Sequence, residues 1–93
     1  MANYLARVEL HNATYEDYEQ LHAAMERRQF HRVIQADDKT WYSLPTGTYN
    51  KYSAATVQEA LNDAIAAANE TGKRHSLIVV SWTAARWDGL PKV

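Results

Sequence analysis

The sequence contains no cysteine, which excludes a disulfide scaffold, a thiolate metal site and a cysteine nucleophile. A chain without cysteine fits a reducing compartment, so we expect a cytoplasmic protein. Long hydrophobic runs are also missing, because the longest one, residues 77–80, is far shorter than a membrane span. The first ten residues carry Arg7 and Glu9 within an apolar stretch and lack the basic region of a secretory signal. We therefore expect neither a targeting segment nor a membrane partner.

The chain also lacks an excess of positive or negative charge. Ten Lys and Arg residues against eleven Asp and Glu residues give a net charge of −1. No general basic field attracts nucleic acid, so any such contact must use a local patch. With 46% hydrophobic and 23% charged residues, the composition excludes a disordered chain, a collagen-like repeat and a coiled-coil rod. A length of 93 residues allows one hydrophobic core, and we expect one domain over residues 1–93.

The first half of the sequence predicts a strand, a helix and two further strands. Apolar and polar residues alternate over 3–11, as in a half-buried strand. Thr14 followed by Asp17 is a capping box at the start of a helix over 14–28. Strands are then expected over 30–36 and 40–48, with a break or bend at Pro45 in the second one. The apolar face of the first strand consists of Tyr4, Ala6, Val8 and Leu10.

The second half predicts a helix and a strand. Ser53 or Thr56 caps the next helix, and Thr56 with Glu59 forms a full capping box before a helical stripe. Gly72 follows that helix as its C-terminal cap. Residues 76–82 form a strand that is apolar on both faces, so we expect both faces to be covered. Residues 83–87 either continue this strand or form a short fifth one. The residues of the two helices that we expect to point inward are Leu21, Met25, Val57, Leu61 and Ile65.

The order strand, helix, strand, strand, helix, strand is typical of the ferredoxin-like α+β fold. In this fold two helices cover one face of an antiparallel sheet, and right-handed crossovers place the first and third strands in its middle. The other face stays open to solvent, a partner or a ligand. On the first strand we expect this open face to carry Arg7, Glu9 and His11.

Six short segments carry a resemblance to a known family over most of the chain. They are YLARVELH at 4–11, ATYEDYEQLH at 13–22, AME at 24–26 with Phe30, LPT at 44–46, TGK at 71–73 and WDGL at 87–90. They resemble small bacterial proteins grouped with GhoS, the antitoxin endoribonuclease of type V toxin–antitoxin systems. The resemblance implies a ferredoxin-like fold related to small CRISPR-associated nuclease-like dimers. It also implies cleavage of a toxin messenger RNA rather than binding of the toxin protein, but it contains no catalytic signature motif.

The residues themselves point to one candidate catalytic row, formed by Arg7, Glu9 and His11. Successive members lie about 6.8 Å apart along a strand. RNA cleavage through the 2′-hydroxyl needs a base, a cation at the phosphate and an acid at the leaving oxygen. His11 or Glu9 can serve as the base, and Arg7 can hold the phosphate. The alternative is a solvated sheet face with a cross-strand ion pair, since polar alternation is normal in antiparallel strands.

Candidate RNA-binding residues are Arg28 at the end of the first helix, Arg32 in the strand after it, and Trp41, on which a base can stack. Alternatively, Arg28 compensates the helix dipole, and Trp41 is a packing or dimer residue. The adjacent Asp37 and Asp38 are typical of a turn. The histidines at 11, 22, 31 and 75 do not have metal-ligand spacing, so we expect no metal and no cofactor.

Two hypotheses for function follow. The first is a small antitoxin-type endoribonuclease that cleaves single-stranded RNA without a metal, as the family resemblance favours. The second is a non-catalytic, dimeric protein-binding module or inhibitor of the phage or bacterial defence type. The near-neutral charge and the three Trp and six Tyr residues favour this one. We expect a homodimer under either hypothesis, with residues 79–87 as its contact.

Overall fold

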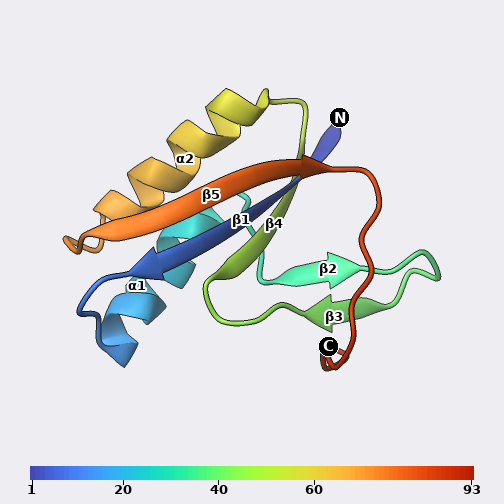
Figure 1. Cartoon of the computed structure of the whole chain (residues 1–93), viewed down its shortest axis with the longest axis horizontal. Helices are drawn as coiled ribbons and strands as arrows, with labels where there is room; N and C mark the ends of the chain where they lie inside the picture. The colour runs from blue at the N-terminus through green and yellow to red at the C-terminus, as the bar shows by residue number, and fades with distance from the viewer.

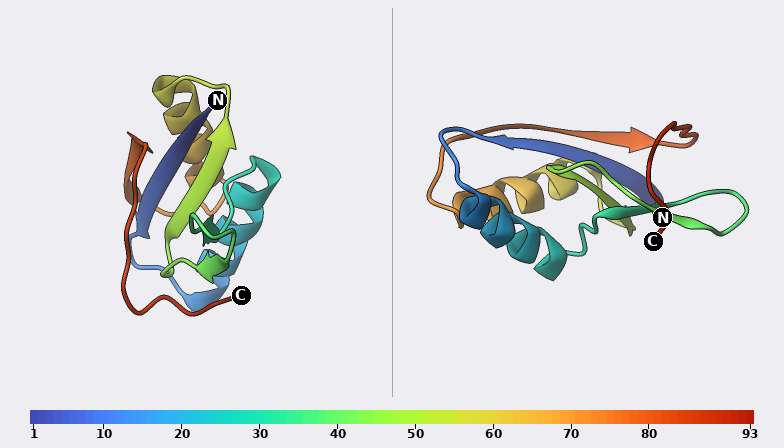
Figure 2. Two further views of the ribbon diagram at one scale, coloured as in Figure 1. Left: turned by 90° about the vertical axis from the view of Figure 1, so that its right-hand side faces the viewer. Right: turned by 90° about the horizontal axis from the view of Figure 1, so that it is seen from below.

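The computed structural model describes residues 1–93 and contains five strands and two helices. The central strand β1 pairs antiparallel with β4 on one side and β5 on the other, whereas β2 and β3 form a separate two-stranded sheet (Figure 1). Both helices lie on the same side of the β4–β1–β5 sheet (Figure 2). The predicted ferredoxin-like α+β architecture is therefore confirmed. The bounds are β1 Ala2–Leu10, α1 Tyr15–Arg27, β2 Val33–Gln35, β3 Trp41–Ser43, β4 Thr48–Ser53, α2 Val57–Asn69 and β5 His75–Trp82.

Both helices begin where the sequence predicts. The Thr14 side chain accepts from the backbone N–H of Asp17, whose carboxylate in turn accepts from the backbone N–H of Thr14. Thr56 and Glu59 form the same reciprocal pair at the start of α2. Each capping box satisfies backbone donors that have no partner within the helix. No helix of the chain is long and apolar enough to cross a membrane.

The two middle strands differ from the prediction. We expected 30–36 and 40–48 to complete the main sheet, but β2 and β3 form a hairpin of their own, and β4 is the strand that pairs with β1. The chain breaks at the predicted place, where a turn from Pro45 to Thr48 passes through Gly47 at φ +83°. A strand that continued through Pro45 would lack a ladder donor there. The segment expected to form the outer strand contacts the main sheet through one isolated bridge, between His31 and Asn50.

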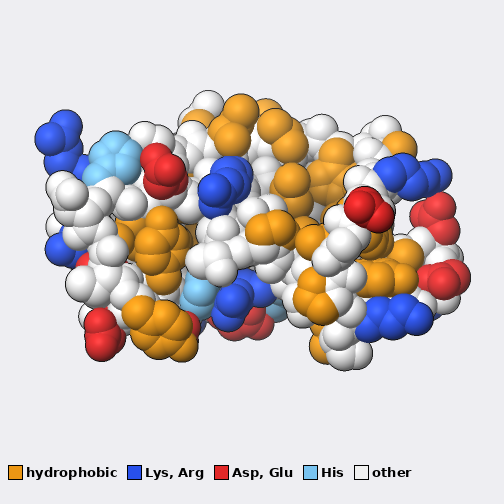
Figure 3. All heavy atoms as spheres, turned by 60° about the horizontal axis from the view of Figure 1, so that its bottom comes forward, with side chains coloured by type: hydrophobic (Ala, Val, Ile, Leu, Met, Phe, Trp, Pro, Cys, Tyr) orange, Lys and Arg blue, Asp and Glu red, His pale blue; other side chains and the backbone are white.

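The C-terminal segment also differs from the expectation. Residues 83–87 neither continue β5 nor form a strand. The chain instead turns at Gly89, which has φ +82°, and its end returns to β3. The N–H of Ser43 donates to Pro91 O at 2.8 Å, and the N–H of Val93 donates to Trp41 O at 3.1 Å. Figure 3 shows hydrophobic side chains at this hairpin end of the molecule, with charged side chains around them.

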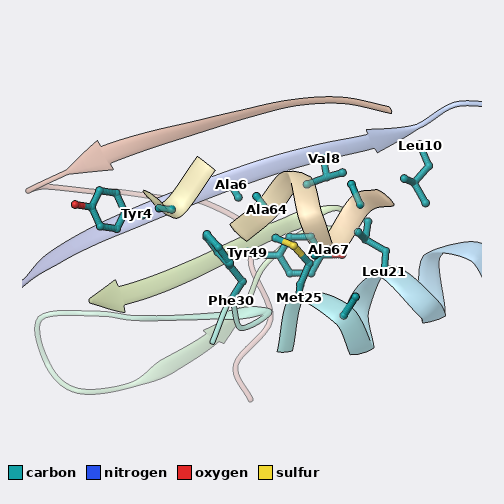
Figure 4. Packing of buried hydrophobic residues seen from close by; sticks show 13 residues of the cluster. Tyr4, Ala6, Val8, Leu10, Leu21, Met25, Phe30, Tyr49, Ala64 and Ala67 are labelled. Carbon is teal, nitrogen blue, oxygen red and sulfur yellow. The ribbon is translucent and has the colours of Figure 1, made fainter. Parts of the chain in front are cut away.

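The core lies between the sheet and the helices (Figure 4). The predicted apolar face of β1 is buried, as are Leu21 and Met25 of α1. In α2, however, the buried stripe consists of alanines, and Val57 is 46% exposed, contrary to prediction. Leu61 and Ile65 are only partly buried. The small alanine side chains let α2 approach the sheet closely, and its larger residues lie at the flank of that contact.

Candidate functional site on the open sheet face

The open face is the side of the β4–β1–β5 sheet opposite the helices. Register partners in adjacent strands share a face, so Arg7 of β1 lies between Thr48 of β4 and Ile78 of β5. Two residues along, Glu9 lies beside Ser76 of β5. Arg7 and Glu9 are exposed, as expected.

The structure brings Glu9 and His11 together at one end of this face. The Nε2 atom of His11 lies 3.0 Å from Ser76 Oγ and 4.0 Å from Glu9 Oε1. The His11 side chain is 42% exposed and that of Glu9 67%, so a ligand on the open face can reach both. The sequence did not indicate Ser76, since only the β1–β5 register reveals its position next to His11. An imidazole held between a hydroxyl and a carboxylate can exchange protons with a ligand.

Arg7, the third member of the predicted row, turns away from this pair. One guanidinium N–H donates to the carbonyl oxygen of Thr46 at 3.0 Å. A Cβ atom at Gly47 would lie 2.5 Å from Arg7 Nη1 and 2.6 Å from the carbonyl oxygen of Val8. The missing side chain of Gly47 thus leaves room for the arginine. Four of the five guanidinium donors are not used by Thr46.

Basic side chains near the C-terminal ends of the two helices are paired with acidic groups. Arg27 and Arg28 both form ion pairs with Glu70, which tie the end of α1 to the end of α2. The hydrogen bond from Arg28, followed by that from Arg27, lowers the pKa of the Glu70 carboxyl. Lys73 lies 3.6 Å from Asp17. These contacts place Arg28 in a link between the helices, where it shares one carboxylate with Arg27.

The other two candidate RNA-binding residues are more accessible. Arg32 is exposed, between the bridge residue His31 and β2. Trp41 is 48% exposed at the start of β3, where it pairs with Gln35. Neither residue lies in the β4–β1–β5 sheet, so the structure does not bring either of them into the open face with His11.

A second polar cluster, which the sequence did not indicate, lies on the helix side. His22 Nδ1 of α1 is 2.6 Å from the hydroxyl oxygen of the fully buried Tyr49 of β4. Burial, and then the charge of Arg32, lowers the pKa of His22, and burial raises the pKa of Tyr49. The neutral imidazole therefore accepts from the phenol. His22 lies within the helix predicted over 14–28, but its partner is 27 residues away in the sequence.

The open face also carries apolar residues that nothing covers. Ile78 and Val80 of β5 are 59% and 40% exposed, and Tyr52 of β4 is 62% exposed. The expectation that both faces of this strand are covered is therefore wrong for the chain by itself. Alternation along β5 leaves its outward residues uncovered because the helices occupy only one side of the sheet.

Of the two turn aspartates, Asp38 stabilises the hairpin turn. Asp38 Oδ1 accepts from the backbone N–H of Thr40 at 3.0 Å, and this hydrogen bond lowers the pKa of the Asp38 carboxyl. No group of three or more histidine or carboxylate side chains is arranged to hold a metal ion. No protein-family model matches the chain, and no curated protein matches it.

Proposed function

We propose that this chain is a small antitoxin-type endoribonuclease that cleaves single-stranded RNA on its open face. The family resemblance motivates this proposal. The observation that carries it is the exposed group of Glu9, His11 and Ser76, in which a titratable imidazole contacts a hydroxyl and lies near a carboxylate. Arg7 adds a cation two residues before Glu9 on the same strand face.

The proposed reaction uses the RNA's own 2′-hydroxyl as the nucleophile. His11 takes the proton of this hydroxyl while the 2′-oxygen bonds to phosphorus. The bond from phosphorus to the 5′-oxygen breaks, and the imidazolium returns the proton to that leaving oxygen. Glu9 stabilises the imidazolium, and Arg7 stabilises the charge that develops on the phosphoryl oxygens. The products are a 2′,3′-cyclic phosphate and a 5′-hydroxyl.

The test is incubation of the pure protein with mixed single-stranded RNA, with and without a chelator. We expect cleavage in both conditions, with cyclic phosphate and 5′-hydroxyl ends. RNA with a 2′-deoxy sugar at the cleavage position should resist, because the nucleophile is missing. No cleavage of any RNA overturns the proposal, and cleavage that the chelator abolishes overturns its metal-independent mechanism.

The alternative function, a dimeric protein-binding module, is favoured by the surroundings of β5. This strand forms one edge of the sheet, so its outer backbone groups are available to pair with another strand. Ile78 and Val80 lie exposed on the open face. On the helix side, an apolar groove of about 210 Å³ follows the same edge, lined mainly by Val57, Leu61, Leu77 and Val79.

We propose that two copies of the chain pair along β5, which joins their sheets. The contact lies nearer residues 77–80 than the expected 79–87, because Trp82 bonds to Asn50 and Trp87 packs on Tyr42 within the chain. Light scattering at tens of micromolar, a rough working range, should show a dimer. Ile78→Lys should give a monomer, whereas Tyr15→Lys, at a 77% exposed position of α1, should remain dimeric. A monomeric wild type contradicts this proposal.

A further inference from the structure

A cleft of about 600 Å³ lies between the β2–β3 hairpin and residues 82–87. Its aromatic lining comes from three elements: Tyr42 of β3, Trp82 of β5 and Trp87 of the C-terminal segment. Tyr42 and Trp87 pack edge to face, with ring centroids 5.4 Å apart. The Nε1–H group of Trp82 donates to Asn50 Oδ1 at 2.8 Å, which fixes the indole. The cleft is therefore preformed, and its volume is in the range of small-molecule sites.

Charged residues line the cleft on both sides. Lys39 and Asp37 come from the hairpin and Arg86 from the C-terminal segment. Arg86 Nη2 lies 3.8 Å from Asp37 Oδ2, and the two side chains are 80% and 95% exposed. Because an exposed ion pair of this kind contributes little, a stronger anion can displace Asp37 from Arg86. Two cations against one carboxylate leave one positive charge, which matches the single negative charge of a phosphodiester.

We propose that this cleft binds one nucleotide, with its base on the aromatic wall and its phosphate at Lys39 and Arg86. Every base has a face that stacks on an aromatic side chain. The carboxamides of Asn3 and Gln35 also line the cleft. Asn3 Oδ1 accepts from Asn50 Nδ2, and Gln35 Nε2 donates to Lys39 O, so the Asn3 amide nitrogen and the Gln35 amide oxygen are left to bond to the edge of a base. A purely apolar ligand would leave these polar groups without partners, and a simple anion would leave the aromatic wall unused.

The cleft continues into the open face. Asn3 and Trp82 are register partners, and their alternation along β1 and β5 puts them on the same face as Glu9 and Ser76. Glu9 is six positions after Asn3, so the cleft lies about 20 Å from the Glu9–His11 pair along the strand. As an RNA subsite, which rests on the proposed function, the cleft holds a base several nucleotides from the cleaved bond. A single RNA strand then follows β1 from one end to the other.

The indole N–H signals of the full chain in a ¹⁵N-labelled sample test the cleft without any cleavage. The sequence has three tryptophans, of which Trp82 and Trp87 line the cleft and Trp41 does not. Titration with adenosine or uridine 5′-monophosphate should shift the Trp82 and Trp87 signals and leave the Trp41 signal in place. The corresponding nucleosides should shift the same two signals at higher concentration. Inorganic phosphate alone should leave them nearly unchanged.

Variants at the cleft separate the two parts of the ligand. Lys39→Gln and Arg86→Gln should each lower the affinity for the mononucleotide by about two- to fivefold, the scale of an exposed ion pair. Neither substitution should change the affinity for the nucleoside. Trp87→Leu should lower the affinity for both ligands by about five- to 150-fold, the scale of one base stack. Arg74→Gln is the matched control. Arg74 is exposed and directly precedes β5, at the end of the strand opposite Trp82, so this variant should bind both ligands as the wild type does.

The outcomes distinguish this proposal from the proposed function. If the two indole signals do not shift, or if all three shift equally, the nucleotide site is wrong, even where the protein cleaves RNA. Equal shifts with phosphate alone would reduce the cleft to an anion site and also overturn it. Selective shifts in a protein that cleaves no RNA would support the nucleotide site and reject the endoribonuclease.

Discussion

The two faces of β1 differ in what surrounds them. On the helix side, Tyr4, Ala6, Val8 and Leu10 are each at most 5% exposed and pack against both helices. On the open side, Leu5 is partly buried, and Arg7 and Glu9 are exposed. Nine residues of one strand thus supply a large part of the core and, through Arg7 and Glu9, part of the candidate site. Since alternate residues point to opposite faces, the composition of one face can change with little effect on the packing of the other.

This difference concerns charge as well as packing. In the polar cluster on the helix side, His22 bonds to Tyr49, and burial lowers the pKa of the imidazole, which favours its neutral form. On the open face, the contact of His11 with Ser76 is exposed, and a ligand can compete for it. The buried pair stabilises one arrangement of the chain, whereas the exposed group is available for chemistry. The predictions below test this division.

The largest effect is expected on the open face, from His11→Ala. Loss of the proton-transferring imidazole should lower the cleavage rate by about 10²–10⁴-fold and change its pH profile, with an unchanged melting midpoint. His31→Ala is the matched control, because its side chain is also 42% exposed and lies 2.7 Å from a carboxylate, that of Glu26. Rate measurements at saturating RNA compare the two variants. An equal loss of activity in both would contradict the assignment of His11.

The next largest effect is a loss of stability from a substitution in the core on the helix side of the sheet. Leu21→Ala should cost about 2–5 kcal/mol of unfolding free energy, because Leu21 is fully buried and its removal leaves a cavity. Leu5→Ala on the partly buried open side should cost about 1 kcal/mol, since less apolar area is lost there. Urea denaturation followed by circular dichroism measures both. Equal costs would mean that the two faces of β1 are packed alike.

The fold was predictable where the signals were local. The pairs Thr14–Asp17 and Thr56–Glu59 mark both helix starts, and the alternation over 3–11 identifies the covered face of β1. The identity of the strand beside β1 was not predictable in this way. Residues 48–53 have no regular alternation, and their place depends on pairing with β1, more than forty residues earlier.

The candidate site was predictable only in part, for the same reason. Alternation places Arg7 and Glu9 on one face, but Ser76 meets His11 across 65 residues of sequence. The ion pairs of Arg28 with Glu70 are also long-range, over 42 residues. Side chains that look free in a sequence acquire partners when distant elements meet. Sequence reasoning therefore found the charged residues and missed most of their contacts.

A smaller effect is expected from Gly47→Ala, in the turn that leads into β4 and approaches β1. The substitution combines a positive φ with a close approach to the carbonyl oxygen of Val8, so it should cost about 1–3 kcal/mol or slightly more. Gly89→Ala is the control, because its φ is nearly the same and no atom lies within 4 Å of the added Cβ. The difference in unfolding free energy between the variants isolates the close approach. If Gly89→Ala costs as much, the contact with Val8 has no effect on stability.

The smallest effect is the pH dependence of stability that arises from His22. Burial and Arg32 lower the pKa of His22 in the folded state, and Glu19 opposes this in part. The unfolded chain therefore binds a proton at a higher pH than the folded chain does. The stability that the neutral histidine contributes is fully present above the unfolded pKa of 6.5, and it is lost as the pH falls from there through the lower folded pKa.

His22→Gln removes this titration, so its unfolding free energy should fall less steeply than that of the wild type between about pH 7 and pH 5. The absolute stability of the variant should also be lower, because Tyr49 loses the imidazole to which it donates. His31→Gln, which changes an exposed histidine of the same chain, should retain the wild-type slope contributed by His22. Urea denaturation at a series of pH values gives the three slopes. If the slopes of wild type and His22→Gln coincide, then burial does not lower the pKa of His22, and the pair with Tyr49 is not held neutral on the helix side.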